Sequence, residues 1–381
     1  MRFNLLVCMT ACVMLFAECK NENSVKNGIL SINNSSESQE VAFEDVATNV
    51  RIVPLISDEP MDGGSSIKCY GSTAFLLASG GESIYIFEDG KMTAKLHKVG
   101  RGRGEYTIIA DYVYSPATKT LFVQGTGSTI LKYSVPDLDY LGSFSLQTVT
   151  GLAVHDDSTL ICRMTSPDDI PGIYFINADN GQVRGKLKDI CGLALLSGTR
   201  MDYYTPDHRI LADGSSINRI SEVSADINDG ENIILQFDFG KDGMPAKFDS
   251  ISSDIDMDFL MEYGQYLNDH RETVVTEISK VMANDSCVSF WYHSGLVGYN
   301  HYCCITDGQA VTYKGFKASG TTGFILPSGL TDQGQYVTII DGLPESLFDD
   351  SGERSEFTAN LEKVMKAQKF NNPVLVFYNI K

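Results

Sequence analysis

The sequence predicts an all-β fold built from repeated antiparallel units. From Val50 onward, short runs rich in β-branched and aromatic residues follow one another, as packed strands do. Turn signals such as Asp-Gly and Asn-Gly, which tolerate positive φ, separate these runs. A coarse repeat of about 40 to 50 residues results, which is typical of the blades of a β-propeller.

The individual strands follow from local composition. Strand-like runs cover residues 49–55, 74–78, 83–87, 112–114, 120–124, 130–133, 151–154, 159–163 and 172–176. Three similar segments, starting at Ser83, Ile130 and Gly172, are expected to occupy the same place in successive units. The chain ends in a further strand, Pro373–Lys381, and Val50–Leu55 is expected to complete its blade. Such pairing would close the ring by joining the two ends.

Two stretches break the strand pattern and predict helices. The first is a helical insertion near 254–283, with Phe259 and Tyr263 on one apolar stripe and a second stripe from Val274 to Met282. One or two helices are expected there. The second is a short helix near 353–369, directly before the final strand. Each helix could lie over a propeller mouth or pack against a blade edge.

The first residues describe an export signal. A basic Arg2, an apolar run and then Cys19 followed by polar residues fit a cleaved signal peptide over residues 1–18, because the apolar run is too short for a membrane span. Cys19 is the predicted lipidation site, and the alternative is an ordinary cleaved signal. We expect residues 19–40 to form a lipidated N-terminus and flexible tether, and residues 41–381 to form the propeller domain.

Charge and cysteine usage limit the classes of function. With 30 basic and 49 acidic residues the net charge is −19, which disfavours nucleic-acid binding. None of the six cysteines after the leader shows a paired zinc spacing, so buried free thiols are expected. Cys303 and Cys304 are adjacent in a strand-like run and should point to opposite faces of it. The sequence predicts no cofactor, no metal site and no catalytic residue.

The segment from Val99 to Tyr106 contains Gly-Arg-Gly-Arg-Gly-Glu-Tyr. It resembles the Gly-Arg-Gly-x-Gly-Glu-Tyr signature of TolB-like six-bladed β-propeller lipoproteins, although that family usually has Pro where Arg103 stands. The strand Val50–Leu55 and the ending Asn372–Val376 extend the likeness over nearly the whole mature chain. The resemblance implies six blades and an outer-membrane lipoprotein facing the periplasm or the cell surface. It implies no agreed activity.

Two groups of residues are candidate binding residues. Arg101 and Arg103 could contact an anion or a glycan, but the glycine loop leads toward a strand and not a helix, so a structural turn is the favoured interpretation. Trp291, Tyr292 and His293 could stack on a sugar ring, although alternation places about half of this aromatic cluster in the core.

The leading functional hypothesis is a lipid-anchored binding module for a ligand or for an envelope or outer-membrane protein, and a nutrient-uptake or envelope complex is the setting that analogy suggests for it. A glycan or small molecule is a possible ligand. The competing hypothesis is a metal-dependent lactonase-like or lyase-like propeller enzyme. Convergence of His155, His208, His293 or His301 with aspartates at one channel mouth would favour the enzyme. A broad exposed patch without a pocket would favour a structural envelope protein.

Overall fold

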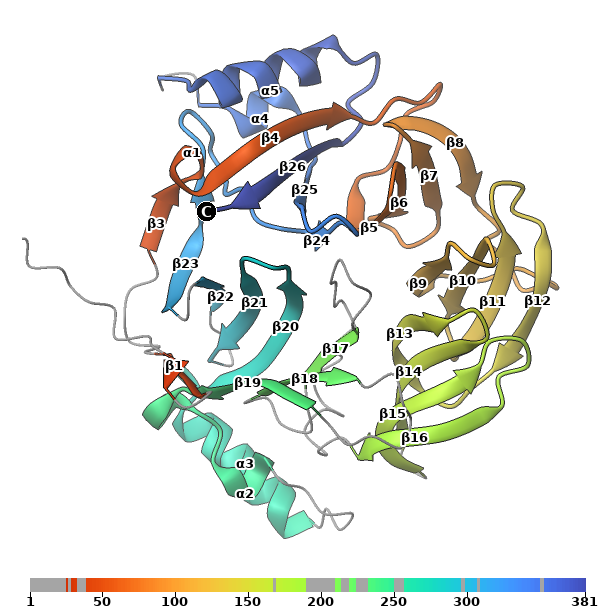
Figure 1. The fold of residues 1–381 in the computed structure, drawn as a ribbon, viewed down its shortest axis with the longest axis vertical. Coiled ribbons are helices and arrows are strands. Elements are labelled where there is room, and N and C mark those ends of the chain that lie inside the picture. Colours follow the sequence, from red (N-terminus) through yellow and green to blue (C-terminus); the bar gives the residue numbers. More distant parts are fainter. Residues whose placement is uncertain are drawn as a thin grey trace, which may run out of the picture.

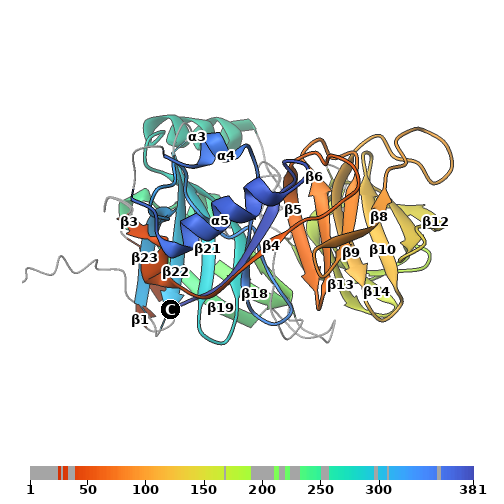
Figure 2. The same ribbon diagram turned by 90° about the horizontal axis from the view of Figure 1, so that it is seen from above.

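Six antiparallel sheets are arranged around a common axis as the blades of a six-bladed β-propeller (Figure 1). The computed structural model describes residues 25–26, 29–32, 39–166, 169–189, 210–213, 219–223, 232–249, 257–295, 299–306, 309–349 and 353–381. Viewed edge-on in Figure 2, the blades form a disc, and the longer helices lie at its outer edge (Figures 1 and 2). Because each sheet buries both of its faces against neighbouring blades, the core is divided among the blade interfaces.

The first three blades are four-stranded meanders in chain order. Blade 1 contains β5 (Gly64–Tyr70), β6 (Thr73–Ala78), β7 (Ile84–Glu88) and β8 (Lys91–Leu96). Blade 2 contains β9 (Ile109–Ser115), β10 (Thr120–Gly125), β11 (Thr129–Ser134) and β12 (Tyr140–Ser145). Blade 3 contains β13 (Val149–Asp156), β14 (Thr159–Ser166), β15 (Asp169–Asn177) and β16 (Val183–Asp189). The three segments that looked alike in sequence contain β7, β11 and β15, the third strand of each blade, as expected.

The remaining blades combine strands from distant parts of the chain. Blade 4 contains β17 (Ile210–Asp213), β18 (Arg219–Val223) and β19 (Asn232–Asp238), extended by β2 (Ile29–Ser31) and β1 (Val25–Lys26). Blade 5 contains β20 (Val275–Ala283), β21 (Val288–Ser294), β22 (Tyr299–Thr306) and β23 (Gln309–Lys317), extended by β3 (Gln39–Ala42). Blade 6 contains β24 (Gly329–Leu330), β25 (Tyr336–Ile340), β26 (Val374–Ile380) and β4 (Ala47–Pro54).

The ends of the domain close the ring, as the sequence predicted. β26 pairs antiparallel with β4, with Val376 opposite Ile52 and Val374 opposite Pro54. The C-terminal strand therefore lies between β25 and an N-terminal strand within one blade (Figure 1). This pairing joins an N-terminal strand to the last strand of the chain through backbone hydrogen bonds within blade 6, so the ring does not depend on side-chain packing alone to stay closed.

The expected tether over residues 19–40 is corrected in its second half. β2 pairs in parallel with β19, with Leu30 opposite Phe237. Leu30 and Ile32 are 0% and 1% exposed and belong to the core shared by blades 3, 4 and 5. The composition around them is polar, but two apolar side chains at alternate positions are sufficient to anchor this short strand between β1 and β19. The chain therefore contacts the propeller before residue 41. Cys19 and the leader lie outside the described residues.

The predicted insertion near 254–283 is helical only in its first part. α3 (Met257–Asp269) packs Tyr263 against Phe248 of the short helix α2 (Ala246–Asp249). The stripe from Val274 to Met282, which we expected to be helical, forms strand β20 instead. A register irregularity between Ser279 and Met282 buries successive residues there and imitates helical spacing in the sequence.

The second predicted helix is confirmed as α5 (Glu356–Ala367), whose N-cap Ser355 accepts a hydrogen bond from the backbone N–H of Thr358. α5 packs against blade 6, with Leu361 and Met365 in its core. Two single turns, α1 (Phe43–Val46) and α4 (Pro344–Leu347), and a 3₁₀ turn (Gly240–Asp242) complete the described helices. None of the helices in the described parts of the chain has the length and apolar character needed to cross a membrane.

The cysteines behave as small buried hydrophobes. Cys69, Cys162, Cys287, Cys303 and Cys304 are free and buried, and Cys191 lies outside the described residues. Cys303 belongs to the core shared by blades 3, 4 and 5, whereas Cys304 belongs to the core of blades 5 and 6. The two adjacent side chains therefore point to opposite faces of β22, as strand alternation predicted.

Candidate functional site

The glycine-rich segment forms a closed turn between blades 1 and 2. The backbone N–H of Gly100 donates to the carbonyl of Tyr106 at 2.8 Å, and the N–H of Gly102 donates to a carboxylate oxygen of Glu105 at 2.7 Å. A side chain at Gly100 would collide with that carboxylate, because an added Cβ would lie 2.0 Å from Glu105 Oε2. The shape of this turn therefore accounts for the presence of Gly100 and Glu105 in the glycine-rich segment.

Arg101 and Arg103 are both exposed on this turn. The guanidinium carbon of Arg103 lies 5.7 Å from the centre of the Tyr140 ring, within cation–π range. Arg103 therefore has a packing partner on blade 2. A ligand-binding role for the two arginines stays a prediction.

Trp291, Tyr292 and His293 follow one another on β21 in blade 5, and alternation separates them. Tyr292 is 1% exposed and stacks on His301, with 4.7 Å between the ring centres. It is a core residue and offers no binding surface in this conformation. Trp291 and His293 are half-buried and lie on the other face of the strand. The structure thus places this group in blade 5 and the two arginines in the turn between blades 1 and 2, and does not combine them into one site (Figure 1).

The histidines named for the enzyme hypothesis are distributed over different blades. His155 lies on β13 in blade 3, while His293 and His301 lie in blade 5, and His208 lies outside the described residues. The ring Nε2 of His301 is 2.8 Å from the hydroxyl of Ser294, and burial lowers the pKa of His301 to about 4. Within the described ranges, no group of three or more His, Cys, Asp or Glu side chains could hold a metal ion.

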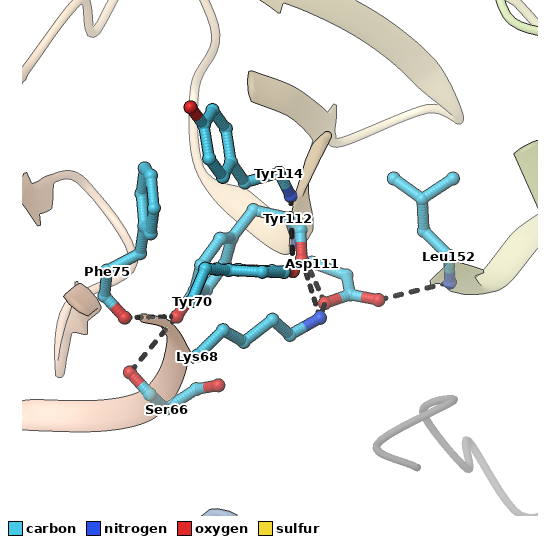
Figure 3. A network of polar contacts seen from close by, with 8 residues as sticks. All are labelled: Ser66, Lys68, Tyr70, Phe75, Asp111, Tyr112, Tyr114 and Leu152. Carbon is cyan, nitrogen blue, oxygen red and sulfur yellow. Dashed lines mark hydrogen bonds and ion pairs between the residues drawn. The ribbon is translucent and has the colours of Figure 1, made fainter. Parts of the chain in front are cut away.

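A buried polar network on the innermost strands of blades 1 to 3 was not predicted. The ammonium of Lys68 on β5 donates to a carboxylate oxygen of Asp111 on β9 at 3.0 Å, and the two residues are 3% and 4% exposed. The other carboxylate oxygen of Asp111 accepts a hydrogen bond from the backbone N–H of Leu152 on β13 at 3.1 Å. Figure 3 shows Lys68 and Asp111 pointing toward each other between the strands. One carboxylate therefore connects three blades.

Tyrosines surround this ion pair. The hydroxyl of Tyr112 donates to the carbonyl of Phe75 at 2.7 Å, and the Lys68 ammonium lies 5.0 Å from the centre of the Tyr112 ring. The hydroxyl of Tyr70 accepts a hydrogen bond from the backbone N–H of Tyr114 at 3.4 Å (Figure 3). Burial raises the pKa of Tyr112 well above its usual value and also raises that of Tyr70. Both phenols are therefore neutral near pH 7 and serve as hydrogen-bonding groups.

The network has a structural cause. An innermost propeller strand has a neighbouring strand on only one side, so part of its backbone needs other partners. The Lys68 ammonium donates to the backbone carbonyl of Tyr112, and the Asp111 carboxylate accepts from the backbone N–H of Leu152. These two side chains thus supply partners for backbone groups of the innermost strands. A lysine within the apolar run Ile67–Tyr70 and an aspartate within Ile109–Tyr114 were the available sequence signals, because a charge inside a buried strand needs a partner.

The described residues also form an open groove between blades 6 and 1. Its volume is about 420 Å³. Blade 6 contributes residues of β4, β26 and the β24–β25 turn, and blade 1 contributes β5, β6 and two hairpin turns. The residues that line it are Arg51, Val53, Leu55, Cys69, Gly71, Ser72, Thr73, Ala74, Asp89, Gly90, Thr331, Gln333, Gln335, Leu375 and Phe377. Sequence analysis did not identify this site, because its residues come from five separate segments of the chain.

The groove is held open by contacts between the turns that form its walls. A carboxylate oxygen of Asp332 accepts a hydrogen bond from the N–H of Gly71 at 2.7 Å, which joins the β24–β25 turn to the β5–β6 turn. The hydroxyl of Thr331 accepts from the N–H groups of Gln333 and Gln335 at 3.3 and 3.1 Å. These bonds fix the backbone of both turns, so the groove is largely preformed.

Cys69 lies at the bottom of the groove and is 8% exposed. Burial raises its pKa to about 12, and the charge of Asp332 adds to this, while that of Arg51 opposes it. The thiol is therefore protonated near neutral pH and is a poor nucleophile.

A second, smaller cavity of about 300 Å³ lies where α5 ends against the start of the β4–β5 connection. Its lining is mainly apolar and includes Ile56, Val364 and Phe370. Its polar lining residues are Ser57, Gln368, Lys369 and Asn372.

Comparisons with known proteins agree with this architecture. A structure named "Putative exported protein" from Bacteroides fragilis has 14% sequence identity over 93% of this chain and 99% of its own, with a TM-score of 0.67. A member of the duf4221 family from Bacteroides vulgatus has 11% identity over 88% of this chain and 97% of its own, with a TM-score of 0.49. No curated protein matches the chain significantly. The family model described as 6-bladed beta-propeller, DUF5128, matches residues 19–266, and the chain belongs to this family.

Proposed function

We propose that this protein is an exported, lipid-anchored propeller that acts as a binding module and holds its ligand in the groove between blades 6 and 1. The leader ending at Cys19 supports export and lipidation. The name of the Bacteroides fragilis structure and the resemblance to TolB-like lipoproteins are consistent with a place in the cell envelope. An envelope or outer-membrane protein partner is part of the same proposal.

The observation that carries the proposal is the set of hydrogen-bonding side chains that the groove leaves available. The amides of Gln333 and Gln335 and the carboxylate of Asp89 line it, and none of the three side chains has a hydrogen-bond partner among the described residues. A preformed cleft with a few convergent polar groups is typical of a small-molecule site. A volume near 420 Å³ suits a small ligand or the end of a larger one.

The chemistry of the groove favours binding over covalent catalysis. Amides, hydroxyls and one guanidinium recognise a ligand by hydrogen bonds, whereas the only thiol in the lining, Cys69, is protonated at neutral pH. We therefore assign the groove to recognition.

The experiment is a thermal-shift screen of the purified protein against panels of sugars, oligosaccharides, amino acids and dipeptides. We expect at least one class to raise Tm, because a ligand that binds only the folded state stabilises it. The double variant Gln333→Ala/Gln335→Ala should lose this shift. Gln182→Ala, which removes an exposed amide from the β15–β16 turn of blade 3, is the matched control and should keep it. A shift that persists in the double variant would contradict the assignment of the groove.

Lipidation is tested separately by metabolic labelling with an alkynyl fatty acid. The wild-type protein should incorporate the label and sediment with membranes, and Cys19→Ala should do neither. A labelled Cys19→Ala protein would refute the predicted lipid site.

A further inference from the structure

Arg51 is a cation of the groove that the described part of the chain leaves without an anionic partner. By comparison, the guanidinium of Arg354 pairs with Glu362. The side chain of Arg51 makes no hydrogen bond or ion pair with the residues that the structure describes, although the chain has a net charge of −19. Its described contact is with the ring of Phe377, whose centre lies 4.2 Å from the guanidinium carbon. Both residues line the groove.

This stacking prepares Arg51 for an anion. Packing against an aromatic ring limits the orientations of the planar guanidinium and leaves its N–H groups directed outward at the edges. Such a fixed fork matches the two oxygens of a carboxylate, which it binds through two parallel hydrogen bonds. Because the side chain is already ordered, less rotamer entropy is lost when the anion binds.

The remainder of the groove suits hydroxyl groups. The amides of Gln333 and Gln335 can each donate and accept, and Asp89 can accept. The hydroxyls of Ser72 and Thr73 both bond to Glu88, so the wall formed by blade 1 is rich in acceptors. A ligand that presents many O–H donors would satisfy these groups.

We propose that the groove binds a carboxylate-bearing, hydroxyl-rich ligand, the chemistry of an acidic sugar, and that Arg51 forms a bidentate pair with its carboxylate. This inference rests on the proposed function, in that the groove must be a binding site. It adds the class of ligand and the residue that selects it. Arg51 is the source of selectivity for acid over neutral sugars, and the amides hold the hydroxyls.

Isothermal titration calorimetry with three probes tests the proposal. The probes are trigalacturonate, its fully methyl-esterified form, and tricarballylate, which has carboxylates but no hydroxyls. We expect the wild-type protein to bind trigalacturonate at least about tenfold more tightly than either other probe, since a tenfold ratio corresponds to about 1.4 kcal/mol. Arg51→Gln should remove the preference for trigalacturonate over its methyl ester, and Arg51→Lys should keep only part of it because an ammonium cannot form the bidentate pair.

Arg271→Gln is the charge-matched control. Arg271 is exposed in the turn after α3, outside the groove, so this variant should bind trigalacturonate like the wild type. Unchanged melting temperatures would show that each variant is folded. Equal binding of trigalacturonate by wild type and Arg51→Gln would overturn the role of Arg51, and equal binding of tricarballylate would overturn the hydroxyl requirement.

The two proposals fail in different ways. If the methyl ester binds as tightly as the acid, and Gln333→Ala/Gln335→Ala weakens both, the groove is a binding site but the acidic class is wrong. If no probe binds and the thermal-shift screen is also negative, the proposed function itself is contradicted.

Discussion

The two interfaces of blade 1 differ in whether their polar side chains find partners within the protein. Toward blade 2, β5 presents Lys68, whose charge is buried and paired with Asp111. Toward blade 6, the next residue, Cys69, lies beneath a groove whose polar side chains have open hydrogen-bonding capacity. Strand alternation sends these neighbours to different interfaces. The comparison teaches that a propeller can satisfy one interface internally for rigidity while leaving the adjacent one available for a ligand.

The largest expected effect is a loss of stability at the interface between blades 1 and 2. Lys68→Met should lower the free energy of unfolding by about 3–5 kcal/mol, because it leaves the buried charge of Asp111 without its partner. The measurement is urea denaturation followed by circular dichroism.

Two controls make this result specific. The double variant Lys68→Met/Asp111→Leu should be more stable than the single variant, since replacing both charges removes the unpaired one. Lys95→Met, which breaks the partly exposed pair with Glu59, should cost less than about 1 kcal/mol. A Lys68→Met protein as stable as Lys95→Met would mean that the buried pair contributes nothing.

The next effect concerns the thiol beneath the groove. With its pKa raised to about 12, Cys69 has a thiolate fraction at pH 8 that is about a thousandfold below that of a thiol of pKa 9, so alkylation should be slower by a similar factor. The rate, followed by peptide mass spectrometry, should still be rising at pH 10. Asp332→Asn should speed the reaction, because the carboxylate raises the pKa of Cys69. A plateau near pH 9 would instead show labelling through unfolded protein.

A smaller effect is expected for Tyr112→Phe. The change removes the hydrogen bond from the phenol to the carbonyl of Phe75, and a hydrogen bond of this kind contributes about 0.5–1.5 kcal/mol to the free energy of unfolding. The same denaturation measurement applies, and the slope with urea should stay unchanged. A loss as large as that of Lys68→Met would mean that the tyrosine, and not the ion pair, dominates the interface.

The smallest effect on stability is expected in the groove between blades 6 and 1. Arg51→Gln should change the free energy of unfolding by less than about 0.5 kcal/mol, because the side chain is exposed and has no ion pair among the described residues. A large loss would assign Arg51 a structural role and weaken its proposed role in binding. The contrast with Lys68 would then no longer separate a structural interface from a binding interface.

The sequence by itself determined the strands, the turns between them, the closure of the ring by Val50–Leu55 with the last strand, and the helix α5. Each of these depends on neighbouring residues, through alternation, turn chemistry or a cap. It failed where burial depends on distant partners. The stripe Val274–Met282 looked helical because a bulge disturbs the alternation of β20, and Ile29–Ser31 looked like tether because its partner strand lies about 200 residues away.

Only the tertiary structure decided which polar residues share a site. It placed Arg101 and Arg103 in the turn between blades 1 and 2, apart from Trp291 and His293 in blade 5, and it placed Tyr292 in the core. It also brought Arg51 next to Phe377, more than 300 residues later in the chain, because ring closure pairs β4 with β26. The physical reason is that local preferences fix the form of each strand, whereas the contacts between blades come from pairing and packing across the whole ring.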